Sequence, residues 1–143
     1  MLSNSSKYAI KAVLFLALHS SKDKKILAKD ISKPINVPPA YIAKLLQPLV
    51  KENIVSSIKG PRGGFYLEED NLNKSIMSII MVIDGEDKWN ACMLSLERCN
   101  AEKPCPLHAA LSASRNDIFW NLNNKTIKEA ISSLQTGDSF LPV

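Results

Sequence analysis

The sequence predicts a mainly helical protein with one small β-hairpin, and three observations lead to that expectation. Apolar residues recur at helical spacing in several segments, two short runs rich in β-branched and aromatic residues flank a glycine-rich loop, and a long amphipathic segment lies beyond them. A chain of 143 residues suits one compact domain, or a small domain with an added arm. Because 45% of the residues are hydrophobic and 22% are charged, wholesale disorder is not expected.

Three helices are expected before residue 52. The segment 7–19 is apolar nearly all round, which is typical of a helix in the middle of a small domain. A short helix over 27–32 is expected to end before Pro34, since proline disfavours helical geometry in the residue that precedes it. Pro38 and Pro39 suit the first turn of a third helix, where a missing N–H costs little.

The third helix has an apolar face and a polar face. Its core-facing stripe has apolar side chains at helical spacing, at Ile42, Leu45, Leu46, Leu49 and Val50. The opposite face presents Tyr41, Lys44, Gln47 and Lys51. Pro48 removes one helical hydrogen bond and clashes with the preceding turn, at a cost of about 3 kcal/mol. We therefore expect a kink or an early end of this helix at Pro48.

Two strands, over 54–58 and 65–67, are expected on either side of the loop 59–64. The glycines of this loop allow the backbone of a tight reversal, and Lys59 and Arg62 place two cations at its tip. Two helices, a turn, a third helix and a hairpin with a basic tip describe a winged helix-turn-helix.

Three more segments are expected beyond the hairpin. An apolar helix over 75–83 should end near Gly85, whereas residues 86–104 show little periodicity. A long helix should run from Pro106 to about Leu122. A capping box formed by Thr126 and Glu129 predicts the start of a last helix, over 127–134.

The long helix carries more apolar surface than an isolated arm would expose, at Leu107, Leu111, Ile118, Phe119, Trp120 and Leu122. Such arms usually pair with a second copy of the chain. The expected organisation is therefore a winged helix-turn-helix DNA-binding domain over 1–85, a cysteine-bearing loop over 86–105, and a dimerisation helix with a C-terminal helix over 106–143.

Charge is distributed unevenly along the chain. Residues 1–67 contain eleven Lys and Arg against three Asp and Glu, whereas residues 68–143 contain seven against eleven. This asymmetry favours a polyanion-binding surface in the front half, with chance clustering on solvated faces as the alternative. We expect DNA phosphates or the minor groove to be contacted by Tyr41, Lys44, Ser57, Lys59 and Arg62.

All three cysteines and one of the two histidines fall within 17 residues, as Cys92, Cys99, Cys105 and His108. Thiolates and a neutral imidazole are donors for a soft or borderline metal centre. The six- and five-residue intervals between the cysteines lack the close pairs of a structural zinc site, and they favour an iron–sulfur cluster. Zinc, or three buried and unreactive cysteines, are the alternatives.

Several other classes of protein are disfavoured. The longest apolar run has seven residues, over 12–18, against about twenty for a membrane span. An odd number of cysteines without a convincing secretory signal argues for a cytoplasmic protein with reduced thiols. No Ser–His–acid set, P-loop lysine or Cys-x-x-Cys pair is apparent, which argues against an enzyme.

Four stretches together resemble the Rrf2 family of bacterial winged-helix transcription regulators: KYAI at 7–10, YIAKLL at 41–46, SSIKGPRGGFYL at 56–67 and the triple-cysteine loop. The resemblance spans nearly the whole chain. It implies a homodimer held by crossed long helices, here over 106–122. It also implies that two recognition helices reach successive major grooves of a pseudo-palindromic double-stranded DNA operator.

The family resemblance also implies roles for individual residues. Ala40, Tyr41 and Lys44 would sit at the front of the recognition helix, and Lys59 and Arg62 at the tip of the wing. The three cysteines would bind an iron–sulfur cluster.

His108 falls where the family's iron–sulfur-assembly regulator has its histidine ligand. Lys7 stands about where the nitric-oxide-sensing repressor of the family offers an acidic ligand, which favours His108 as the fourth ligand here.

The expected function is therefore that of a DNA-binding regulator, a repressor, controlled by a two-iron, two-sulfur cluster, with a four-iron cluster as the alternative. Two rival functions stay open. One is a regulator that senses zinc or the thiol redox state without iron. The other is an adaptor that uses its winged helix to hold a protein partner.

Overall fold

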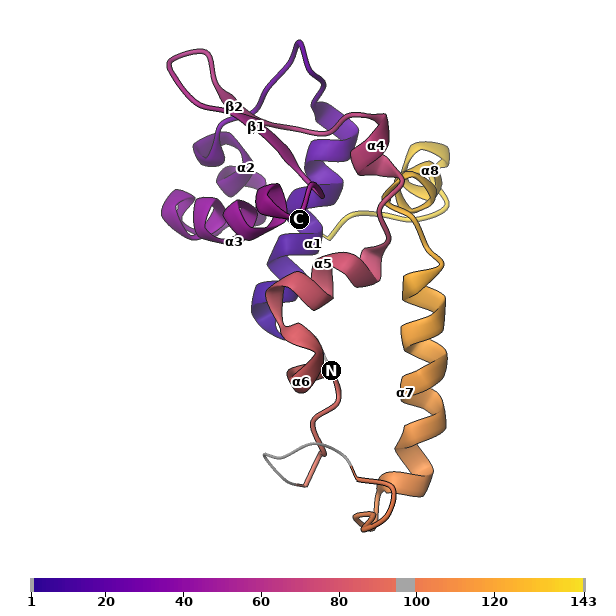
Figure 1. Cartoon of the computed structure of the whole chain (residues 1–143). Helices are drawn as coiled ribbons and strands as arrows, with labels where there is room; N and C mark the ends of the chain where they lie inside the picture. Colours follow the sequence, from indigo (N-terminus) through magenta and orange to yellow (C-terminus); the bar gives the residue numbers. More distant parts are fainter. Residues whose placement is uncertain (1, 95–99, 143) are drawn as a thin grey trace.

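The computed structural model describes residues 2–94 and 100–142, and within them the chain forms eight helices and one two-stranded antiparallel sheet (Figure 1). The elements are α1 (Asn4–His19), α2 (Ala28–Ile35), α3 (Pro39–Lys51), β1 (Ser56–Ile58), β2 (Gly64–Tyr66), α4 (Glu69–Leu72), α5 (Ile76–Ile83), α6 (Gly85–Trp89), α7 (His108–Asn123) and α8 (Ile127–Thr136). The expected fold class, mainly helical with a small hairpin wing, is confirmed.

Helix α1 lies at the centre of the core, as its apolar character predicts. It packs against α2, α3, α5 and α8, and four of its apolar side chains are fully buried: Ala9, Ala12, Val13 and Leu16. The predicted stripe of α3 faces the same core, with Ile42, Leu46 and Leu49 fully buried. Contact on several sides explains why α1 has so little polar surface.

Pro34 does not end its helix as expected, and of the two outcomes expected at Pro48, a kink or an early end, the early end does not occur. Helix α2 continues through Pro34 to Ile35 and ends at Asn36, which has a left-handed backbone (φ 61°) and donates its N–H to the Ser32 carbonyl. Helix α3 continues through Pro48 to Lys51. Buried leucines on both sides of Pro48 hold the helix in the core, so tertiary packing outweighs the hydrogen bond that proline removes.

The wing is shorter than the sequence suggested. Strand β1 pairs with β2 so that Ser57 lies opposite Phe65, but Ile54 and Val55 do not join the hairpin. Their N–H groups donate to the Leu49 carbonyl, and both side chains are buried in the core. The outer edge of β2 pairs instead with Ile26, through two hydrogen bonds with Phe65 of 2.8 and 2.9 Å.

Glycine is required at two positions of the wing. A Cβ on Gly63 would lie 2.0 Å from the Ile58 carbonyl oxygen, and a Cβ on Gly64 would lie 2.9 Å from the Ile26 carbonyl oxygen. Gly64 also has a φ of 146°, which other residues rarely adopt. The close approach of three backbone segments at the base of the wing therefore depends on these glycines.

Helix α8 folds back onto the winged-helix core. Backbone hydrogen bonds join Ile76 to Lys125 and Ile127 to Lys74, at 2.8 and 2.9 Å, and the Ile127 side chain is fully buried. The predicted capping box of Thr126 and Glu129 is present, and the helix runs two residues farther than expected, to Thr136.

Helix α7 lies along the outside of this core and is joined at its lower end to the cysteine-bearing segment (Figure 1). None of its side chains is buried, and Trp120 is 66% exposed. The short helix α6, which the sequence did not predict, ends at the buried Trp89, whose ring lies 6.2 Å from that of Phe119. Within residues 2–94 and 100–142, no helix combines the length and the apolar character that crossing a bilayer demands.

Candidate DNA interface and metal centre

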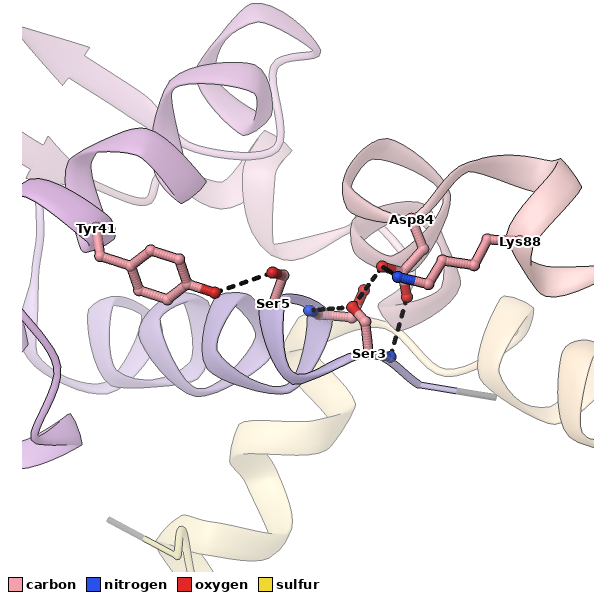
Figure 2. Close-up of polar contacts among 6 residues, drawn as sticks. Ser3, Ser5, Tyr41, Asp84 and Lys88 are labelled. Carbon is pink, nitrogen blue, oxygen red and sulfur yellow. Dashed lines mark hydrogen bonds and ion pairs between the residues drawn. The ribbon is translucent and has the colours of Figure 1, made fainter.

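The front of α3 presents two of the three residues expected there to solvent. Ala40 and Lys44 are exposed, whereas Tyr41 is half-buried. The Tyr41 hydroxyl hydrogen-bonds the Ser5 hydroxyl at 2.9 Å (Figure 2). The Tyr41 ring also packs edge-on against Tyr8, with 6.0 Å between the ring centroids. Tyr41 therefore joins the start of α3 to the first turns of α1, a role that its place on the polar face did not reveal.

Proline shapes the start of α3. Pro38 is its N-cap, with the Pro38 carbonyl accepting hydrogen bonds from the N–H groups of Tyr41 and Ile42 at 3.0 and 3.2 Å. Because Pro39, the first helical residue, has no N–H, this helix start offers one backbone donor fewer to a phosphate than other residues would provide. Recognition at this end must depend more on side chains such as Lys44.

The wing carries its charge at an exposed tip. Ser57, Lys59 and Arg62 are all exposed, and neither of the two cations is ion-paired within the described ranges. A groove separates the wing from the C-terminal half of α3, with Gln47 and Val50 on one wall and Ser57 and Lys59 on the other. The basic tip and the polar face of α3 thus belong to one surface of the winged helix-turn-helix.

Three of the four expected metal ligands line one cavity at the start of α7. The half-buried side chains of Cys92, Cys105 and His108 line one small cavity, together with Met93, Leu107, Leu111, Ser112 and Arg115. The turn that begins α7 brings two of them close, since the His108 N–H donates to the Cys105 carbonyl at 3.0 Å. The fourth expected ligand, Cys99, lies outside the described residues.

Arg115 holds the other side of this cavity in place. Its guanidinium donates to the Ala91 carbonyl at 3.2 Å, directly before Cys92. His108, Leu111 and Arg115 recur at helical spacing, so one face of α7 meets the cysteine-bearing segment. No local sequence pattern pointed to Arg115, because its partner is a backbone carbonyl 24 residues away.

The donors present fit a metal centre chemically, although the described ranges do not complete one. In residues 2–94 and 100–142, no three His, Cys, Asp or Glu side chains are close enough to hold a metal ion. Two cysteines and one histidine are among the residues that line the cavity, and sulfur and imidazole donors of this kind suit iron–sulfur or zinc coordination.

Comparison with known proteins agrees with this architecture. The chain matches the family model of Rrf2, described as an iron-dependent transcriptional regulator, over residues 2–133. It is 31% identical over 132 residues to a helix-turn-helix protein of Aquifex aeolicus, which covers 91% of this chain and 90% of the relative.

Two further proteins resemble the chain. The transcriptional regulator IscR of Vibrio vulnificus is 32% identical over 131 residues, which covers 92% of this chain and 77% of IscR. The fold is similar to that of CymR, the global cysteine regulator of B. subtilis, with a TM-score of 0.73, 20% identity and coverage of 92% and 96% of the two chains. The long family match and the observed winged helix together show that this chain belongs to the Rrf2 family of DNA-binding transcriptional regulators.

Proposed function

We propose that this Rrf2-family regulator binds an iron–sulfur cluster through Cys92, Cys99, Cys105 and His108, and that the cluster sets its affinity for DNA. One observation carries the proposal: Cys92, Cys105 and His108 line a single cavity although they come from both sides of the cysteine-bearing segment. The family's description as iron-dependent and the similarity to IscR support the same chemistry.

Each described ligand has a structural element that positions it. Cys105 and His108 are joined by the first turn of α7, and Cys92 follows the backbone carbonyl that Arg115 holds. When bound, a two-iron, two-sulfur cluster would supply a redox-sensitive and oxygen-labile centre, and a histidine ligand would raise its reduction potential. Cluster retention should weaken in acid because thiolates and a neutral imidazole are the binding forms. A four-iron cluster is the alternative nuclearity.

The DNA-binding part of the proposal assigns α3 to the major groove and the wing to the neighbouring phosphates or minor groove. Ala40 and Lys44 lie on the exposed face of α3, and Ser57, Lys59 and Arg62 lie on the exposed wing. A helix-turn-helix places the N-terminal part of its recognition helix against the base edges, while cations of the wing neutralise phosphates. Tyr41 serves in positioning α3.

We infer further that the protein is a homodimer that binds a pseudo-palindromic operator and acts as a repressor. Three apolar side chains of the α7 segment are exposed, at Leu107 (38%), Phe119 (36%) and Trp120 (66%). A second copy packed along α7 would remove this surface from water. The two recognition helices of such a dimer would then face two half-sites of the operator.

A zinc- or thiol-sensing regulator without iron is the second candidate. Two cysteines at one cavity could serve it, and the chain shares the fold of CymR, which is named a global cysteine regulator. Anaerobic purification followed by absorption spectroscopy and by iron, sulfide and zinc analysis separates the two. Broad bands between about 320 and 460 nm with equal iron and sulfide support the cluster. A colourless protein with one zinc per chain contradicts it.

Replacing one ligand sharpens this experiment. Cys105→Ala should abolish the visible bands and leave the far-UV circular dichroism unchanged, since the side chain is only half-buried. Ser112→Ala is the matched control, because Ser112 lines the same cavity without belonging to the ligand set. Visible absorption bands of wild-type intensity in Cys105→Ala would show that the ligands are assigned wrongly.

A further inference from the structure

The first turn of α1 is attached to a carboxylate 81 residues away. Ser3, the N-cap of α1, accepts a hydrogen bond from the Ser6 N–H at 3.0 Å and donates its own hydroxyl to Asp84. The Ser3 N–H donates to the other oxygen of the same carboxylate, at 3.2 Å (Figure 2). A negative carboxylate at the positive end of α1 is also favoured by the helix dipole.

Asp84 stands at the junction of two helices. It is the C-cap of α5, where its N–H donates to the Ile80 carbonyl at 2.8 Å, and it is also the N-cap of α6. Its side chain is only 3% exposed, and the Lys88 ammonium lies 3.6 Å away on the next turn (Figure 2). A carboxylate so placed cannot shift without breaking its hydrogen bonds to α1.

The same end of α1 touches the recognition helix. Ser5, two residues after Ser3, makes the hydroxyl–hydroxyl hydrogen bond to Tyr41 on α3, and Tyr8 packs against the Tyr41 ring. Figure 2 shows the first turn of α1 between Asp84 and Tyr41. The start of α1 is thus in contact with the α5–α6 junction and with the front of α3 at once.

On its other side, Asp84 is close in sequence to the candidate metal centre. Helix α6 starts directly after it and ends at the buried Trp89, three residues before Cys92. A short helix anchored by a buried tryptophan moves as one body. The wing and the cysteine-bearing segment themselves lie at opposite ends of the molecule (Figure 1), so a signal between them needs such a connection.

We propose that Asp84 and Ser3 form a latch that transmits the state of the cysteine-bearing segment to the recognition helix. In this view a shift of Cys92 moves α6, Asp84 carries that shift to Ser3, and the first turn of α1 repositions α3 through Ser5 and Tyr41. Asp84 and Ser3 are positioning residues: they contact neither the DNA nor the metal centre. The latch rests on the proposed function, since the signal is taken to arise at the cysteines.

The test compares DNA affinity in the two cluster states. The probe is a DNA duplex selected from a random-sequence library with the wild-type protein, and the measured quantity is the ratio of its Kd values for cluster-free and cluster-loaded protein. Coupling free energies of this kind correspond to ratios of about 5–150. Ser3→Ala and Asp84→Asn should each bring the ratio close to one while the visible spectrum of the loaded protein is unchanged.

Two further variants separate transmission from general destabilisation. Ser3→Thr keeps a capping hydroxyl and should restore the wild-type ratio. Thr126→Ala removes the equivalent cap of α8, where the Thr126 hydroxyl accepts from the Glu129 N–H, so it lowers stability to a similar extent without touching the latch. Its ratio should stay at the wild-type value although its thermal midpoint falls.

The outcomes distinguish the latch from the function on which it rests. If the ratio of Kd values in the wild type differs clearly from 1, and both Ser3→Ala and Asp84→Asn keep that same ratio, the latch is overturned but the proposed function is not. A wild-type protein with a cluster but a ratio of one overturns the proposed function and the latch together. Loss of the ratio in Thr126→Ala as well would show that stability, and not the latch, sets the coupling.

Discussion

Tyr41 offers the sharpest test of how α3 is held, because two variants remove the same hydrogen bond from opposite sides. Tyr41→Phe and Ser5→Ala each delete the contact of 2.9 Å between the two hydroxyls. Both variants keep an aromatic ring at position 41, so the packing against Tyr8 at 6.0 Å is retained. The expected loss is therefore that of one neutral hydrogen bond and not of an aromatic contact.

The size of the effect follows from the burial of the pair. A neutral intramolecular hydrogen bond contributes about 0.5–1.5 kcal/mol, and a half-buried pair belongs at the lower end because water can replace the missing partner. For a chain of this length, about 1 kcal/mol corresponds to a fall of roughly 2–4 °C in the thermal midpoint. The double variant should lose little more than either single one, since only one bond is present to lose.

Urea unfolding of the wild type and the three variants measures this cycle, and DNA binding adds a second readout. If the Tyr41 hydroxyl acts only through Ser5, both single variants should change DNA affinity by the same factor. Strictly additive losses of stability would refute the assigned bond. A fall of about tenfold in affinity confined to Tyr41→Phe would show instead that the hydroxyl binds DNA directly.

Three other predictions test the wing, the exposed face of α7 and the buried carboxylate. Arg62→Ala should weaken DNA binding at every sequence and reduce the slope of log K against log salt by about one. Lys125→Ala, which changes an exposed lysine between α7 and α8, should leave the slope unchanged, and equal slopes for the wild type and both variants would show that the wing does not contact DNA. Trp120→Glu should convert a dimer into a monomer in light scattering, while Lys128→Glu on α8 should not; a dimeric Trp120→Glu protein would place the interface elsewhere. Burial raises the pKa of Asp84, but the hydrogen bonds from Ser3 and the charge of Lys88 outweigh it and hold that pKa below its ordinary value of 3.8. The carboxylate therefore stabilises the fold above pH 3.8, and this contribution is lost as the pH falls through the lower folded-state pKa. Asp84→Asn should accordingly be less stable than the wild type at pH 7 and approach it in strong acid, and a stability difference that does not change with pH would contradict this.

Local patterns along the chain were enough to predict the fold class and most of its elements. The stripe of α3, the capping box of α8 and the glycine-rich turn of the wing each depend on residues that are close in sequence, so short-range signals predict them. The closeness of Cys105 and His108 is local in the same way, since the His108 N–H bonds the Cys105 carbonyl in the turn that starts α7, whereas the cavity that both share with Cys92 depends on tertiary packing.

The sequence by itself therefore determined the type of most segments, and only the tertiary structure decided where they end and how they pack against one another. Helix α3 continues through Pro48 because buried leucines on both sides of the proline pack in the core. The Tyr41 hydroxyl is directed toward α1 because it hydrogen-bonds Ser5 there. Arg115 and Asp84 find their partners 24 and 81 residues away, at distances where no periodic pattern connects the two positions. Side chains of this kind meet their partners only once the core has brought distant helices together. Closing such a long loop costs conformational entropy, and packing of the core must offset that cost.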